Sequence, residues 1–304
     1  MIHRALLAAA CALLLGGCGV GPGDATKGVD ARVTDDFGAR VVGTAAAEET
    51  RGEETVMRFL QRSFDVTTAY GGGFVQSIDG VRGQGEGGSV DWFYYVNGIE
   101  APKGAASTRL FAGDRVWWDR HRWEAAMHIP AVVGSWPEPF RRGSGGERYP
   151  VRLECASGAD TACRTVQDRL AAAGVTAGRA GLGSSAGRDV LRLVVGPWAQ
   201  IRGDAALNQI GRGAAASGVF ARPAASGDTL TVLNRAGRPA RTFGAGAGLI
   251  AATRLGEQQP TWAVTGTDAR GTLAAARALG TRTLRDRFAL ALDPAGRPVP
   301  LPAR

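Results

Sequence analysis

The sequence feature that most limits the fold is a run of strand-forming residues at positions 90–96, followed at once by Asn97-Gly98. β-branched and aromatic residues are typical of strands, and Asn-Gly is a strong signal for a tight turn. A second run of this kind, residues 115–120, follows Gly113-Asp114. The chain is therefore expected to build a sheet here, with short glycine turns between its strands.

Further strands are predicted before this run. Residues 31–34 and 40–42 flank Asp35-Asp36-Phe37-Gly38, which predicts a β-hairpin with a glycine-containing turn. Another strand is predicted at residues 74–78, and a glycine-rich stretch separates it from residues 90–96.

One helix is predicted between the hairpin and the later strands. It begins at Thr50, because Glu53 completes a capping-box pattern three residues on. Apolar residues then recur at helical spacing and give one apolar face: Val56, Phe59, Leu60 and Phe64. A helix laid across one face of a mixed sheet satisfies this order of elements, which is the β-grasp arrangement.

Short motifs occur in this region in a fixed order. They are Gly73-Phe74-Val75-Gln76-Ser77-Ile78-Asp79-Gly80-Val81, Trp92-Phe93-Tyr94-Tyr95-Val96-Asn97-Gly98, Gly104-Ala105 and Gly113-Asp114-Arg115-Val116-Trp117-Trp118. With the preceding helix, this series resembles the transcobalamin-like C-terminal family, a domain of bacterial exported proteins named after the smaller domain of vertebrate cobalamin carriers. The resemblance covers about residues 30–122. It implies a β-grasp fold and a corrinoid ligand, although the large helical barrel of the vertebrate carriers is not visible in this sequence.

The second half of the chain has a different pattern, in which predicted strands alternate with predicted helices. Strands are expected at residues 151–154, 190–195 and 261–265, and a helix is expected near residues 248–255. Such alternation argues for an α/β domain with a largely parallel sheet.

The predicted boundaries follow from these patterns and from local composition. Residues 30–123 form the β-grasp domain, and residues 148–297 form the α/β domain. Residues 124–147, which are rich in proline, arginine and glycine, have the composition of a linker. Residues 298–304 are a tail.

The first residues predict export. A basic start and an apolar run at residues 5–15 are typical of a signal peptide, and the run is too short to span a membrane. Leu15-Gly16-Gly17-Cys18 fits a lipobox, so residues 1–17 would be removed and Cys18 would be acylated. Residues 18–29 would then be a tether to the lipid bilayer on the extracytoplasmic face of the cell membrane. The alternative is an ordinary secretory peptide that is cleaved elsewhere.

Two cysteines remain once Cys11 has left with the signal peptide and Cys18 carries lipid. In an oxidising compartment, Cys155 and Cys163 are expected to form a disulfide. Closing so short a loop contributes about 2 to 3 kcal/mol in the chain-entropy model. His121 and His128 are the only histidines after the signal, and their spacing predicts no metal site. We also expect no cofactor.

The chain is basic, with 36 Lys and Arg residues against 28 Asp and Glu residues and a net charge of +8. A positive field raises the local concentration of anions, which suits anionic lipids, cell-wall polymers and acidic ligands. The arginines are scattered and accompany no nucleic-acid motif, so a solvated surface is favoured over nucleic-acid binding.

Aromatic residues are concentrated on the predicted strands. Because strand neighbours point to opposite faces, one face should be core, whereas the other would offer rings that stack on sugars, corrinoids or polymer chains. The alternative is that both faces are covered and the rings only pack. The predicted ligand-binding residues are Ser77, Asp79, Trp92, Tyr94, Asn97, Trp117 and Trp118.

No catalytic constellation is predicted. Residues 183–187 match the G-x-S-x-G pattern, but a glycine-rich turn precedes them and no histidine follows His128. The glycine-rich residues 244–248 are interpreted as a tight turn into a helix, because the spacing of a phosphate-binding fingerprint is missing.

Two functions remain. The first is a lipid-anchored, ligand-binding protein that presents a cobalamin-like nutrient to a membrane importer. The second is a structural or adhesive module of the cell envelope that binds wall polymer or a protein partner. We do not expect an enzyme.

Overall fold

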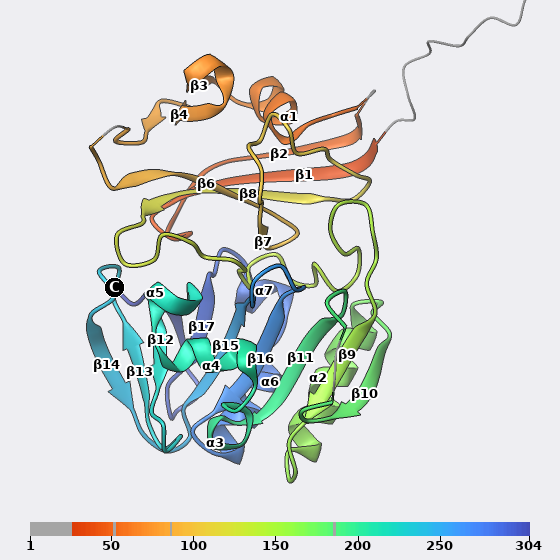
Figure 1. The fold of residues 1–304 in the computed structure, drawn as a ribbon, viewed down its shortest axis with the longest axis vertical. Helices are drawn as coiled ribbons and strands as arrows, with labels where there is room; N and C mark the ends of the chain where they lie inside the picture. Colours follow the sequence, from red (N-terminus) through yellow and green to blue (C-terminus); the bar gives the residue numbers. More distant parts are fainter. Residues whose placement is uncertain (1–25, 51–52, 86, 185–186) are drawn as a thin grey trace, which may run out of the picture.

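Figure 1 shows two stacked halves in the computed structural model, which describes residues 26–304 apart from 51–52, 86 and 185–186. The N-terminal half comprises β1 (Thr26–Asp35), β2 (Arg40–Thr50), α1 (Val56–Ser63), β3 (Val66–Ala69), η1 (Tyr70–Gly72), β4 (Phe74–Ile78), β5 (Val81–Arg82), β6 (Val90–Val96), β7 (Ile99–Glu100) and β8 (Arg115–Arg122). The C-terminal half comprises β9 (Val151–Cys155), α2 (Asp160–Ala172), β10 (Ala177–Gly181), β11 (Leu191–Pro197), α3 (Trp198–Ile201), α4 (Ala205–Gly211), α5 (Ala214–Ser217), β12 (Ala221–Pro223), β13 (Leu230–Leu233), β14 (Pro239–Phe243), β15 (Gly248–Thr253), β16 (Thr261–Gly266), α6 (Ala269–Ala278), α7 (Thr281–Leu284), β17 (Ala289–Leu292) and β18 (Pro298–Leu301).

The main sheet of the N-terminal half has the strand order β2-β1-β8-β6-β7. Its central pair, β1 and β8, is parallel, and its other pairs are antiparallel. Helix α1 and the small sheet β3-β4-β5 lie over one face (Figure 1). Buried side chains from α1, β1, β6 and β8 form one apolar core between these layers. The predicted hairpin at residues 31–42 is confirmed as β1 and β2.

Helix α1 begins later than the sequence predicts, so the capping box at Thr50 is wrong. Strand β2 continues to residue 50 because its backbone still pairs with β1 there. Thr55 is the actual N-cap, and its side chain accepts a hydrogen bond from the backbone N–H of Arg58 at 3.3 Å. Glu53 instead forms an ion pair with Arg109 at 3.2 Å.

The large sheet of the C-terminal half has the order β10-β9-β11-β16-β15-β17-β18 and is mixed. Strands β10, β9, β11 and β16 are parallel neighbours, whereas the remaining pairs are antiparallel. The helix predicted near residues 248–255 is wrong, because β15 occupies this segment. All six residues of β15 are buried, and the strand pairs with β16 along its whole length and with β17 at residues 248–250, so the segment lacks the apolar-polar alternation that signals a strand.

Two cores enclose this sheet. Helices α2 and α6 cover one face, where Val166 and Ala275 belong to the same buried cluster as strand residues such as Trp262. The other face packs against α4, α5 and the small sheet β12-β13-β14, and the same core continues into the N-terminal half through Tyr95 and Trp117.

The junction between the halves is closely packed. Residues 124–147, which have the composition of a linker, contribute buried side chains including Ile129, Val132 and Trp136. The ring of Phe288 lies 5.0 Å from that of Trp117 and 5.7 Å from that of Tyr95, measured between centroids. The two halves therefore share one apolar interface.

The disulfide between Cys155 and Cys163 is confirmed, with 6.1 Å between the two Cα atoms. It joins the end of β9 to the first turn of α2. Within the part of the chain that the structure describes, no helix has the length and hydrophobicity needed to cross a membrane. Cys18 and the predicted signal peptide lie outside the described residues.

Candidate functional site

A hollow of about 380 Å³ lies where both halves meet beside β7, and we call it the β7 pocket. Three stretches of chain contribute its lining, namely residues 96–111, residues 144–145 and residues 254–259. The first belongs to the N-terminal half, and the last is the loop between β15 and β16. The pocket therefore exists only because the two halves are packed together.

The lining of the β7 pocket is amphipathic and carries charges of both signs. Val96, Ile99 and Phe111 supply apolar surface. Lys103, Arg109 and Arg254 supply positive charge, Glu100 and Glu257 supply negative charge, and Ser107, Thr108, Gln258 and Gln259 supply neutral hydrogen-bonding groups. Apolar surface with a few polar groups to fix orientation is typical of small-molecule sites.

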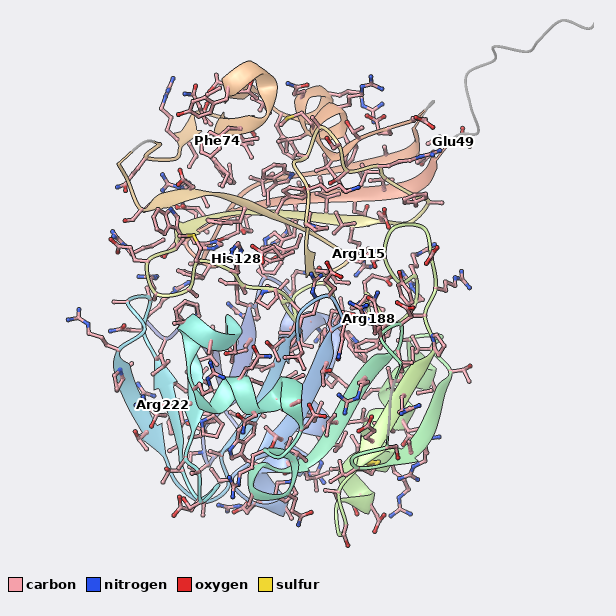
Figure 2. The ribbon with its side chains drawn as sticks, in the orientation of Figure 1. Glu49, Phe74, Arg115, His128, Arg188 and Arg222 are labelled. Atoms are coloured by element: carbon pink, nitrogen blue, oxygen red, sulfur yellow. A yellow bond between two sulfur atoms is a disulfide. The ribbon has the colours of Figure 1, made fainter. Side chains whose placement is uncertain are left out.

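Glu100 is a partly buried acid in the lining of this pocket. Burial raises the pKa of its carboxyl group above the usual value, and the hydrogen bond and charge of His128 only partly offset this effect. One oxygen of Glu100 lies 3.3 Å from Nδ1 of His128, which is exposed (Figure 2). Glu100 therefore gains a proton more readily than an exposed glutamate, and the protonated carboxyl can donate a hydrogen bond into the pocket.

Two of the predicted ligand-binding residues, Tyr94 and Asn97, support the walls of this pocket without lining it. The hydroxyl of Tyr94 lies 2.8 Å from Oγ1 of Thr108 and donates to the backbone carbonyl of Lys103. Burial raises the pKa of Tyr94, so the hydroxyl stays protonated. The side chain thus holds the loop at residues 103–108 against the sheet.

Asn97 is fully buried and has a positive φ of 53°. Its Nδ2 donates to Oδ1 of Asp114 at 2.8 Å and to the carbonyl of Gly143 at 2.9 Å, and its Oδ1 accepts from the backbone N–H of Arg115 at 2.9 Å. Asn97 therefore forms the predicted turn and ties it to the segment that contributes Ser144 to the pocket.

The predicted tryptophans lie on both faces of the sheet and are buried. Trp92 and Trp118 belong to the core beneath α1, and their Nε1 atoms have no hydrogen-bond partner among the described residues. Trp118 also stacks on Tyr94 at 4.7 Å. Trp117 lies on the opposite face, where its Nε1 donates to Oγ1 of Thr34 at 2.7 Å. None of the three lines the β7 pocket.

Ser77 and Asp79 lie at the small sheet of the N-terminal half and also do not line the β7 pocket. The hydroxyl of Ser77 is buried and lies 2.6 Å from that of Thr67 on β3. Asp79 is exposed and accepts a hydrogen bond from the backbone N–H of Asp65 at 2.9 Å. Both contacts pair neighbouring parts of the sheet.

A second region of the junction is hollowed and rich in arginine. Two adjoining hollows of about 390 Å³ and 370 Å³ share Arg115 and Thr281 in their linings, and we call them together the arginine cleft. β1, β2, β8, residues 134–137, the end of α2 and the region of α7 contribute to it. Its five arginines are Arg32, Arg115, Arg141, Arg169 and Arg285. Trp117 is the one predicted ligand-binding residue in its lining.

A buried polar network holds the β1–β2 turn at this junction. The carboxylate of Asp119 accepts from the backbone N–H groups of Phe37 at 3.0 Å and Gly38 at 2.8 Å, and from the hydroxyl of Thr34 at 2.5 Å. Nδ1 of His121 lies 2.9 Å from the same carboxylate. Asp119 is fully buried, so its charge depends on these donors for stabilisation.

Sequence reasoning missed most of the lining of both regions. Lys103, Arg109 and Arg254 carry no motif, and residues 254–259 begin inside the segment that the sequence predicts as a helix. The five arginines of the cleft come from separate segments, so their convergence leaves no local pattern in the sequence. The one available signal was the turn at Asn97-Gly98, which marks the edge of the β7 pocket.

Comparisons with known proteins give one family match. A family model described as Domain of unknown function (DUF4430) matches residues 53–122, from just before α1 to the end of β8. This region lies inside residues 30–122, which resemble the transcobalamin-like family, but the matched description does not name that family. No curated protein matches the chain.

Among solved structures, the crystal structure of a proposed metal binding protein from Ruminococcus gnavus ATCC 29149 is similar, with 15% identity and a TM-score of 0.25. The similarity covers 32% of this chain and 97% of that chain. In the described part of the present chain, no group of three or more His, Cys, Asp or Glu side chains is arranged to hold a metal ion.

Proposed function

We propose that the protein is a lipid-anchored extracytoplasmic binding protein that holds a cobalamin-like nutrient in the β7 pocket and passes it to a membrane importer. The observation that carries this proposal is the pocket itself, an amphipathic hollow to which both halves contribute. The signal-peptide and lipobox pattern that ends at Cys18 supports the anchored location.

A transcobalamin-like β-grasp assignment for the N-terminal half supports the choice of ligand. In its favour, β1 and β8 form a parallel pair, antiparallel strands β2 and β6 flank this pair on its two sides, and α1 lies across one face. The resemblance of residues 30–122 to that family points to corrinoids. A pocket of about 380 Å³ is at the small end of the usual range for ligand sites, so a corrinoid would project from it.

We favour binding over catalysis because no histidine follows the serine motif at residues 183–187 in the chain. The nucleophile of this pattern would be Ser185, and the neighbouring Ser184 donates its hydroxyl to the carbonyl of Gly181 at 2.8 Å. Ser185 of the same motif lies outside the described residues.

The test is a titration of the chain from residue 19 onward with cobalamin and related corrinoids, followed by tryptophan fluorescence and by corrin absorption. Ser107 lines the pocket and is exposed, so Ser107→Trp should fill the pocket without disturbing a core. We expect saturable binding that Ser107→Trp weakens about tenfold or more, a loss of about 1.4 kcal/mol.

The matched control is Ser157→Trp, a change at another exposed serine, in the disulfide loop. It should bind like the unmodified chain. No binding at high micromolar concentration would exclude a corrinoid ligand. Equal weakening by both variants would show that the β7 pocket is not the site.

A second candidate function is a structural or adhesive module of the envelope that binds wall polymer or a protein partner. The net charge of +8 and the arginine cleft favour it, because both attract anionic partners. If this is the function, the corrinoid titration should show no saturable change in fluorescence or absorption.

A further inference from the structure

We propose that the arginine cleft binds a phosphate-bearing ligand. This site is separate from the β7 pocket, and the inference does not depend on a corrinoid ligand. Arg115 lies at the start of β8, at the boundary between the two halves (Figure 2). Arg169 belongs to the last turn of α2, and Arg285 directly follows α7. The cations therefore converge from elements that are far apart in the sequence.

The charge of the cleft is only partly balanced. Arg32 forms an ion pair with Asp286, and Arg141 forms one with the buried Glu138 at 3.0 Å. The cleft has three other arginines, namely Arg115, Arg169 and Arg285. Among the described residues, none of these three forms an ion pair with a carboxylate. The hollow that contains Arg115, Arg141 and Arg169 has no acidic residue in its lining.

Backbone carbonyls hold two of the unpaired guanidinium groups in place. Nη1 of Arg115 donates to the carbonyl of Trp136 at 3.2 Å, and Nη2 of Arg169 donates to the carbonyl of Arg277 at 3.0 Å. A carbonyl orients a guanidinium group without cancelling its charge. Each group also keeps further N–H donors for a ligand, because a guanidinium has five.

A phosphoryl group fits this arrangement better than a carboxylate does. Arginine binds phosphate through paired, charge-assisted hydrogen bonds, and its planar donor geometry matches the oxygens. A phosphate monoester offers three strong acceptor oxygens, which can meet donors from different directions. Ser135 and Thr281 line the same cleft and can add hydroxyl donors.

The phosphate can come from two sources. Asp30, midway along β1, is the register partner of Arg115, the first residue of β8, so the cleft lies where β8 begins. If Cys18 is acylated as proposed, residues 19–25 connect the lipid to β1, which begins four residues before Asp30, and lipid headgroups are then within reach of the cleft. The other source is a free phosphate ester or a phosphate-containing polymer.

The experiment uses the chain from residue 19 onward and two matched assays. Calorimetric titrations with sn-glycerol 3-phosphate and with acetate compare the phosphoryl group with a carboxylate. Sedimentation with phosphatidylglycerol or phosphatidylcholine vesicles tests the headgroup source. Arg169→Gln and Arg115→Gln remove one cation each, and Arg222→Gln removes an exposed arginine on β12, away from the cleft (Figure 2).

We expect glycerol phosphate to bind more tightly than acetate, and binding to weaken with added salt. Arg169→Gln and Arg115→Gln should each weaken it about tenfold or more, and Arg222→Gln should leave it unchanged. Binding to phosphatidylglycerol vesicles alone, with the same dependence on Arg169 and Arg115, would support the inference and identify the headgroup source.

Three results would overturn the inference. The first is that neither glycerol phosphate nor phosphatidylglycerol vesicles bind. The second is that acetate binds as tightly as the phosphate ester. The third is that all three variants weaken binding equally, which would indicate only a response to net charge. Circular dichroism spectra of the variants show that each has folded before it is compared.

Discussion

The β7 pocket and the arginine cleft lie at the same junction and have similar volumes, about 380 Å³ for the pocket and about 390 Å³ and 370 Å³ for the two hollows of the cleft. Their chemistry differs. The pocket combines apolar surface with charges of both signs, whereas three guanidinium groups in the cleft have no carboxylate partner among the described residues. Two hollows of similar volume at the same junction can therefore bind different ligands. The charges that the fold leaves unpaired decide which ligand each hollow can bind.

The largest effect is expected from removing the buried polar network around Asp119 at the junction between the halves. Asp119→Ala would leave the backbone N–H groups of Phe37 and Gly38 without their acceptor in a buried site. We expect a loss of about 3 kcal/mol in the free energy of unfolding, measured by urea denaturation. Ligand binding to both regions should weaken, because both need the packed junction.

The control for this change is Asp168→Ala, at an exposed position on α2. Its effect should stay within about 0.5 kcal/mol. If Asp119→Ala were equally mild, the junction would not depend on this network.

Removal of the disulfide should lower the free energy of unfolding without changing ligand binding by the β7 pocket or by the arginine cleft. The double variant Cys155→Ser and Cys163→Ser should lose about 2 to 3 kcal/mol, because the bridge closes a short loop in the unfolded chain. Neither cysteine lines either region, so binding by the folded protein should not change. Thermal unfolding gives the first quantity and titration gives the second. Altered binding would show that the two regions respond to distant strain.

A smaller change, Tyr94→Phe, should affect ligand binding in the β7 pocket but not in the arginine cleft. Tyr94→Phe removes the hydroxyl that holds the loop at residues 103–108 but keeps the ring that stacks on Trp118. We expect a stability loss of about 1 kcal/mol and weaker binding in the β7 pocket, with phosphate binding in the cleft unchanged. Parallel titrations of the variant with a corrinoid and with glycerol phosphate check this. Equal weakening of both would contradict the independence of the two sites.

The smallest effect concerns pH and Glu100. Burial raises the pKa of Glu100 in the folded protein above its ordinary value of 4.5, so the folded state holds this proton more strongly than the unfolded state does. The stabilisation is complete below the unfolded pKa and is lost as the pH rises through the folded pKa. Urea unfolding from about pH 4 to about pH 8 should show stability falling relative to Glu100→Gln. A constant difference between the two proteins would mean that Glu100 is not perturbed.

The sequence was informative where local pattern decides structure. The hairpin, the turn at Asn97 and the disulfide could all be predicted, because each depends on residues that are close together in the chain. The helix expected near residues 248–255 was wrong because β15 is buried on both faces, so its apolar residues carry no periodicity. The start of α1 was wrong because pairing between β1 and β2 overrode a local capping signal.

The candidate sites could be predicted less well than the fold, and the reason is physical. Alternation along a strand predicts that neighbours such as Tyr94 and Tyr95 point to opposite faces, and the two side chains do pack in different cores, but alternation does not show what covers each face. The C-terminal half and residues 124–147 cover one face, and α1 covers the other. Likewise, only the tertiary fold brings Arg115 and Arg169 together, from β8 and α2.

The turn between β1 and β2 has a consequence for the order in which the chain matures. The ring of Phe37 packs on Phe220 and Phe288 at centroid distances of 5.1 Å and 5.2 Å, and a Cβ atom on Gly38 would meet the carbonyl oxygen of Asp286 at 2.1 Å. This early hairpin therefore docks on residues that are made about 180 to 250 positions later. Until those residues have been synthesised, the ring of Phe37 lacks the aromatic partners that bury it in the folded chain, so we expect the N-terminal half to be prone to aggregation during synthesis.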